Sequence, residues 1–162
     1  MPGHDYAQGG VYFVTVCTER RALLFGDVVD GTMRANDVGR MVEVTWHETV
    51  LRSTSIASDA FQLMPNHVHA LVVIAGVADS APSTSLADFI GRFKSMSTRL
   101  YGDRLRAGRP TAPRCRLWQR NYYEHLIRND MSRDRILRYI AANPSRWPFD
   151  RENPRAVRAT DP

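Results

Sequence analysis

Several features that would place this chain in a familiar class are missing. Its 162 residues include two cysteines, Cys17 and Cys115, and neither lies in a CxxC pair, so a disulfide framework is excluded. No stretch approaches the roughly 20 apolar residues that a membrane span requires. The opening MPGHDYAQGG also lacks the basic and apolar regions of a signal peptide. We therefore expect a cytoplasmic protein that has no membrane contact and folds as one domain over residues 1–162.

Lysine is nearly absent as well, since the chain has 21 arginines and one lysine. The positive charge is concentrated in one half: residues 1–91 have a net charge of −5 and residues 92–162 a net charge of +10. A basic half on a small protein indicates a polyanionic partner, with nucleic acid as the first candidate. The alternative is that arginine is the general solubilising cation of a protein from a GC-rich genome.

Four segments are predicted to be strands. The β-branched and aromatic run at residues 11–18 indicates a central strand, because it is apolar on both faces. Residues 55–63 and 67–74 flank the turn Pro65-Asn66, so they predict an antiparallel hairpin. Residues 116–127 predict a fourth strand at the edge of the sheet.

Apolar residues at helical spacing predict three helices. The first begins at Asn36 or Asp37 and ends near Leu51, and the second is capped by Ser85 and covers residues 86 to about 101. The last begins near Ser132 and ends at Asn143, because the residue before a proline is pushed out of helical geometry. We expect the other segments to be a connection at residues 20–31, a mobile basic loop at 102–114, and flexible or extended ends at 1–10 and about 148–162.

The order of these elements, β-α-β-β-α-β, is that of a ferredoxin-like α+β fold with an antiparallel sheet, here followed by an extra C-terminal helix. Fold alone does not define function, so the functional prediction must come from particular residues.

The most informative segment is MPNHVHALVVI at residues 64–74. Side chains alternate along a strand, so His67 and His69 point to the same face and Val68 points to the opposite one. Two imidazoles on one face can share a metal ion. The simple alternative is that the two histidines are polar surface residues without a function, at the point where the strand leaves its turn.

Other classes that use paired histidines fit this sequence poorly. A histidine-triad nucleotide hydrolase would have a third histidine where Leu71 stands, and a two-histidine phosphoesterase would repeat an HxT/S motif. A structural zinc site would need further cysteines or histidines nearby. What is left is a divalent ion bound by two imidazoles and an oxygen ligand.

The last helix offers such an oxygen ligand. Tyr139 and Asn143 are four residues apart, so they share one face of the helix. A tyrosine can be a nucleophile toward phosphorus, and an amide oxygen can bind a hard cation. The alternative is that Tyr139 is a core aromatic beside Ile136 and Ile140, and that Asn143 only ends the helix.

Four blocks together resemble the REP-associated tyrosine transposases, which belong with the IS200/IS605-type single-strand transposases among the HUH endonucleases. The blocks are MPNHVHALVV, SLADFIGRFKSMSTRLY, WQRNYYEHLIR and YIAANPSRW, and the similarity extends from about Gly10 to Asn153. The resemblance implies a metal-dependent single-stranded DNA endonuclease and strand transferase. Such an enzyme cleaves near hairpins or palindromic repeats through a 5′-phosphotyrosine intermediate.

The resemblance also implies roles for particular residues. By position in the family motifs, His67 and His69 hold the metal, Tyr139 on the extra C-terminal helix is the catalytic nucleophile, and Asn143 is the third ligand. Many insertion-sequence relatives have glutamine in that last place. The cofactor would be Mg²⁺ or Mn²⁺. The adjacent Tyr122 and Tyr123 are alternative nucleophiles, although they lie on the strand block rather than on the helix.

The implied partner is single-stranded DNA with a hairpin, bound by a monomer or a homodimer. Trp118 and Trp147 could stack on unpaired bases, or they could complete the core. Two other functions are open: a domesticated hairpin-binding protein without transposition, and a metal-independent RNA-binding module, which would leave the histidine pair unexplained. The residues expected to contact DNA are Arg92, Lys94, Arg116, Arg120, Tyr122, Tyr123 and Arg128.

Overall fold

The computed structural model describes residues 9–76, 84–109, 111 and 115–157. Four strands form one antiparallel sheet in the order β4-β5-β1-β6. The elements alternate as predicted, which confirms the ferredoxin-like α+β fold. The sheet strands are β1 (Gly10–Cys17), β4 (Ile56–Met64), β5 (His67–Ile74) and β6 (Tyr123–Ile127), and the α-helices are α1 (Asp37–Leu51), α2 (Leu86–Gly108) and α3 (Asp130–Ala142).

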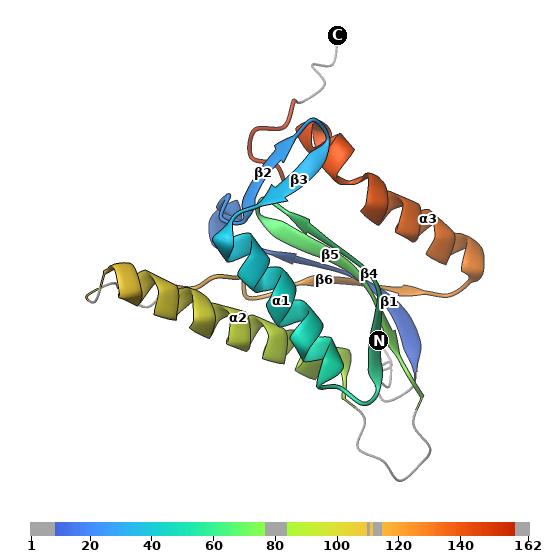
Figure 1. Ribbon diagram of the computed structural model, residues 1–162. Helices are drawn as coiled ribbons and strands as arrows, with labels where there is room; N and C mark the ends of the chain where they lie inside the picture. Colours follow the sequence, from blue (N-terminus) through green and yellow to red (C-terminus); the bar gives the residue numbers. More distant parts are fainter. Residues whose placement is uncertain (1–8, 77–83, 110, 112–114, 158–162) are drawn as a thin grey trace.

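The two faces of the sheet carry different helices. Helices α1 and α2 cover one face, and α3 lies across the opposite face (Figure 1). The side chains of β5 divide accordingly, since Val68 packs into the core under α1 and α2 whereas Leu71 packs with Ile140 of α3. His67 and His69 have the same parity as Leu71, so both rings lie on the α3 face.

The core under α1 and α2 is built around buried aromatic rings. Trp46 of α1 has no exposed surface, and its ring centroid lies 5.1 Å from that of Phe89 and 5.0 Å from that of Phe93. Trp118 is 2% exposed and donates a hydrogen bond from Nε1 to Oγ of Ser97 at 2.8 Å. Of the two alternatives for Trp118, completing the core is confirmed and stacking on DNA bases is wrong.

Residues 20–31 are more ordered than the predicted connection. A short hairpin, β2 (Gly26–Val29) and β3 (Thr32–Ala35), precedes α1. Asp30 and Gly31 form the turn between them, and their φ angles of 51° and 69° are the left-handed backbone conformation that a two-residue type I′ turn requires. We missed the strands because each has only four residues.

Helix α2 is longer than predicted and ends at Gly108, so the first half of the expected basic loop at 102–114 is helical. Good helix formers at residues 104–107 extend it, and Arg106 pairs with Asp103 one turn earlier at 2.6 Å. Strand β6 covers only the second half of the predicted strand at 116–127. In the first half, Trp118 forms a single isolated bridge with Thr18. Strand β6 lies at the edge of the sheet, as expected.

Helix α3 begins where Asn129 accepts a hydrogen bond from the backbone N–H of Ser132. Near that end, a bulge in β4 leaves Asp59 outside the regular pairing, and its carboxylate forms an ion pair with Arg133. Beyond α3 the chain forms a 3-10 helix, η2 (Pro144–Phe149), and then turns, in place of the flexible or extended tail that we expected.

Within the described residues, no helix combines the length and the apolar character needed to cross a membrane. Our expectations for residues 1–8, 110, 112–114 and 158–162 lie outside the described residues.

Candidate active site

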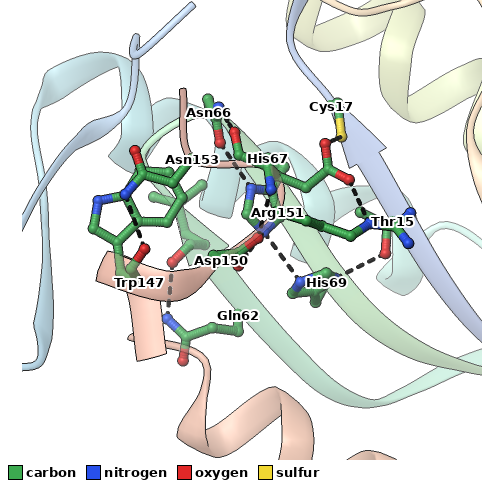
Figure 2. Close-up of polar contacts among 12 residues, drawn as sticks. Thr15, Cys17, Gln62, Asn66, His67, His69, Trp147, Asp150, Arg151 and Asn153 are labelled. Carbon is green, nitrogen blue, oxygen red and sulfur yellow. Dashed lines mark hydrogen bonds and ion pairs between the residues drawn. The ribbon is translucent and has the colours of Figure 1, made fainter. Parts of the chain in front are cut away.

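Four segments meet beside the histidine pair: the end of β1, the start of β5, the last turn of α3 and the tail after α3. Figure 2 shows Thr15, His67, His69 and Asp150 from these segments facing one another. Register explains part of the arrangement, because Thr15 stands opposite His69 in the β1–β5 ladder. Parity along each strand directs these side chains to the α3 face.

The two histidine rings are held by neighbours at their Nδ1 atoms. His67 Nδ1 donates to Oδ1 of Asn66 at 2.8 Å, because an amide oxygen can only accept. His69 Nδ1 lies 2.8 Å from Oγ1 of Thr15. With Nδ1 of each ring occupied in this way, the two Nε2 atoms face each other at 3.1 Å.

Both rings are neutral at physiological pH. Burial lowers the pKa of His67 well below its usual value, and the neighbouring His69 lowers it further. Burial also lowers the pKa of His69 to about 3. Neutral imidazole is the form that binds metal, so neither ring has to lose a proton first.

The atoms around the two Nε2 atoms fit a divalent cation. Asp150 Oδ2 lies 3.8 Å from His67 Nε2, and the ligand atoms of His67, His69 and Asp150 are all within 4.8 Å of one another. Oδ2 of Asp150 is buried without a hydrogen-bond partner, as is Oδ1 of Asn143, whose side chain lies beside the Asp150 carboxyl. Two nitrogens that bind one ion at ~2.1 Å and roughly a right angle would lie about 3 Å apart, close to the observed spacing.

Tyr139 stands at the entrance to this group of residues. Its ring centroid lies 5.4 Å from that of His69, and its side chain is 36% exposed. Burial and the charge of Asp150 raise its pKa, while a side-chain hydrogen bond from Asn143 acts in the opposite direction. A cavity of about 160 Å³ lies in front of it and is lined by Phe13, Thr15, His69, Tyr123, Tyr139, Arg151 and Glu152.

Of the four residues singled out from the sequence, His67 and His69 face each other, and Tyr139 lies beside His69. Asn143 contacts Tyr139 and Asp150. The structure also separates the two alternative nucleophiles. Tyr123 lines the cavity beside Tyr139, whereas Tyr122 has the opposite parity and packs against the core under α1 and α2. Tyr122 is therefore a poor alternative nucleophile.

The other residues expected to contact DNA lie away from the histidines. Lys94, Arg116 and Arg120 line a groove of about 950 Å³ between α2 and residues 115–120. Lys94 Nζ donates to the carbonyl oxygens of Gln119 and Arg120 at 2.6 and 2.9 Å, so it holds the wall of the groove together.

Two arginines of that set lie outside this groove. Arg92 lines a separate hollow with Asp88 and Arg52, and Arg128 is an exposed residue directly after β6. None of these basic residues lines the tyrosine cavity.

The sequence analysis missed several residues of the site, among them Asp150, Glu152 and Asn66. Asp150 and Glu152 lie in a tail whose sequence shows no periodic pattern, so nothing local marks them as buried. Asn66 could have been found, because a polar residue directly before a His-x-His strand is placed to contact the first ring. Glu152 receives a hydrogen bond from Cys17 and an ion pair from Arg21, which fixes the tail against β1.

Comparison with known proteins identifies relatives of the chain. A family model described as "Transposase IS200 like" matches residues 8–143. An uncharacterised protein of Haemophilus influenzae is 29% identical over 163 residues, covering 91% of this chain and 87% of its own length. Another from the same organism, named "Putative REP-associated tyrosine transposase", is 25% identical over 157 residues, covering 90% of this chain and 81% of its own length.

A solved structure shares the fold. It is that of a REP-associated tyrosine transposase bound to a REP hairpin, and it superimposes with a TM-score of 0.63 at 19% identity. The match covers 90% of this chain and 73% of that chain.

Proposed function

The chain belongs to the IS200-like transposase family, a family of DNA-processing enzymes, and from this premise we propose that it is a metal-dependent single-stranded DNA endonuclease and strand transferase. It would cleave near hairpins or palindromic repeats through a 5′-phosphotyrosine intermediate. The observation that carries the proposal is the 5.4 Å between the ring centroids of Tyr139 and His69. The hairpin bound by the structural relative supports hairpin DNA as the substrate.

The metal site in this proposal consists of His67, His69 and Asn143. The cofactor would be Mg²⁺ or Mn²⁺, since imidazole favours Mn²⁺ and amide oxygen suits either. When bound, such an ion would polarise a non-bridging oxygen of the scissile phosphate and offset its charge. Asn66 and Thr15 hold the two rings in position through their Nδ1 atoms, at 2.8 Å each.

Tyr139 performs the covalent step. Its phenol oxygen forms a bond to phosphorus while the bond from phosphorus to the 3′ oxygen breaks, and overall the phenol proton moves to that 3′ oxygen. The pKa of Tyr139 is raised, so the phenol is protonated before the attack. The nearby Asn143 and Arg151 lower its pKa and thus favour the developing phenolate. The 3′-OH of another strand can then attack the phosphotyrosine and reverse the step. This strand transfer needs no external energy source, because the phosphotyrosine bond stores the energy of the broken bond.

DNA would be held by two surfaces. The groove that contains Arg116 and Arg120 can receive phosphates, and its contacts would be independent of sequence. Tyr123, half exposed beside the cavity, can stack on an unpaired base close to the scissile phosphate.

The proposal is tested with a labelled hairpin oligonucleotide, Mn²⁺ and the full-length protein. We expect a covalent adduct that survives denaturation in detergent, and Tyr139→Phe should abolish it. Tyr122→Phe is the matched control, because this ring packs on the far side of the sheet. Tyr123→Phe should also keep the adduct, because its ring remains available for stacking.

Two results would contradict the proposal. Hairpin binding without any adduct would indicate a domesticated DNA-binding protein that does not turn over. Normal cleavage after treatment with EDTA would show that the metal has no part in the reaction.

A further inference from the structure

We propose that Asp150 is a fourth protein ligand of the metal ion, so that the tail after α3 completes the metal site. This inference rests on the proposed function and deepens it. Asp150 lies beyond residues 8–143, the part of the chain that the family model matches. The histidine pair and Asn143 all lie within that part.

The two carboxylate oxygens of Asp150 have different surroundings. Oδ1 accepts a hydrogen bond from the backbone N–H of Glu152 at 2.7 Å, which closes a tight turn in the tail. Oδ2 has no hydrogen-bond partner within 3.5 Å and lies 3.8 Å from Nε2 of His67. The Asn143 side chain beside this carboxyl offsets only part of the rise that burial causes in the pKa of Asp150. The Asp150 side chain is only 4% exposed, so water does not compensate Oδ2. An unpaired buried carboxylate oxygen is costly, and a cation beside two neutral imidazoles is the partner that removes this cost.

Glu152, the other buried carboxylate of the tail, has no such unpaired oxygen. Its oxygens pair with Arg21 and Arg151, each at 3.0 Å, and one of them also accepts from Sγ of Cys17 at 3.6 Å. Glu152 therefore anchors the tail, whereas Asp150 is the carboxylate directed at the histidines (Figure 2).

The position of Asp150 is fixed by contacts to the histidine strand itself. Asn66 Nδ2 donates to the carbonyl oxygen of Glu152 at 2.7 Å, while Oδ1 of the same amide accepts from Nδ1 of His67. One amide thus orients both the first histidine and the turn that contains Asp150. A ligand position prepared in this way is what a preorganised metal site requires.

The charge of Asp150 also bears on the choice of ion. Two neutral imidazoles and an amide leave both positive charges of a divalent ion uncompensated, and the carboxylate removes one of them. Carboxylate ligands suit Mg²⁺ and Mn²⁺. A site that includes Asp150 would therefore bind Mg²⁺ or Mn²⁺ more tightly than a site made of the three neutral ligands alone.

The test measures Mn²⁺ binding to the full-length protein by calorimetry without DNA. Asp150→Asn keeps the shape of the side chain and the oxygen that closes the turn, but it removes the charge. We expect the dissociation constant for Mn²⁺ to rise roughly tenfold or more, since even outer-shell partners of metal ligands change affinity by this much. Asp134→Asn, at an exposed position of α3, is the matched control and should bind as the unsubstituted protein does.

His67→Ala distinguishes the ligand role of Asp150 from the metal-dependent function of the whole site. If Asp150→Asn binds Mn²⁺ normally while His67→Ala loses it, Asp150 is not a ligand and the proposed function stands. If the unsubstituted protein binds no Mn²⁺, both the ligand and the metal-dependent function are wrong.

A second measurement needs no folded variant. In protein labelled with ¹³C at the aspartate carboxyl carbons, the Asp150 resonance should shift when Mg²⁺ is added. A resonance that does not move would overturn the inference, even if Asp150→Asn fails to fold.

Discussion

The ring of Tyr139 lies edge-on to the ring of His69 within one chain, with the centroids 5.4 Å apart. One chain therefore contains both the proposed nucleophile and the histidine pair, and it needs no partner to bring them together. We predict that mixing Tyr139→Phe with His67→Ala will not restore adduct formation on a hairpin oligonucleotide. Adduct yield at equal total protein is the measurement. Recovery in the mixture would mean that Tyr139 acts on the metal site of a second chain.

Thr15 is predicted to act through His69. Thr15→Val keeps the β-branched shape but removes Oγ1, which lies 2.8 Å from Nδ1 of His69. Because outer-shell partners orient metal ligands, we expect Mn²⁺ affinity and the rate of adduct formation to fall about 10–100-fold. Thr15→Ser retains the hydroxyl group and should recover most of the loss. If Thr15→Val and Thr15→Ser behave alike, the hydroxyl has no positioning role.

The basic groove lined by Arg116 and Arg120 should contribute to the affinity for hairpin DNA but not to the covalent step. Replacing Arg116 and Arg120 by alanine should weaken hairpin binding, and the slope of log K against log salt should decrease by about 2 if each arginine contacts one phosphate. Adduct formation at saturating DNA should be unchanged. The matched control is the double alanine variant of Arg34 and Arg40, exposed arginines of β3 and α1. Equal salt slopes for the two variants would exclude the groove as a DNA contact.

Cys17 should resist alkylation while the tail is in place. Burial and the charge of Glu152 raise the pKa of its thiol from 9.0 to about 12. A higher pKa means less thiolate, so at pH 8 iodoacetamide should modify Cys17 roughly a thousandfold more slowly than a thiol of ordinary pKa. Peptide mapping by mass spectrometry would measure this, with the exposed Cys115 as internal reference.

Substitution of Glu152 by glutamine should lower the pKa of Cys17 and speed its modification, because the neighbouring negative charge is removed. Equal rates for Cys17 and Cys115 in the unsubstituted protein would contradict the docked position of the tail.

Much of the fold could be predicted because its patterns are local. The two-residue period of β5 is enough to place His67 and His69 on one face, and the four-residue spacing of Tyr139 and Asn143 places them on one side of α3. The caps Asn36 and Ser85 mark the starts of α1 and α2, since both side chains accept backbone hydrogen bonds there.

The remainder depends on contacts between distant residues. Asn66 and Glu152 are 86 positions apart, and neither shows any sign of the other in the sequence. Trp118 follows a basic stretch that reads as surface, yet it is buried because Phe25 and Phe93 enclose it, with ring centroids 5.3 Å away in each case. Asp150 has the composition of a solvated tail, and only the folded arrangement places its carboxylate beside His67.

The bulge at Asp59 has a consequence for the helix that carries the nucleophile. The ion pair between Asp59 and Arg133 attaches the first turn of α3 to β4, and Asn143, directly after the last turn, is buried. Removing the bulge residue would restore a regular edge strand and remove this ion pair. The bulge in β4 thus supplies one of the contacts that join the sheet to α3, the helix on which Tyr139 lies.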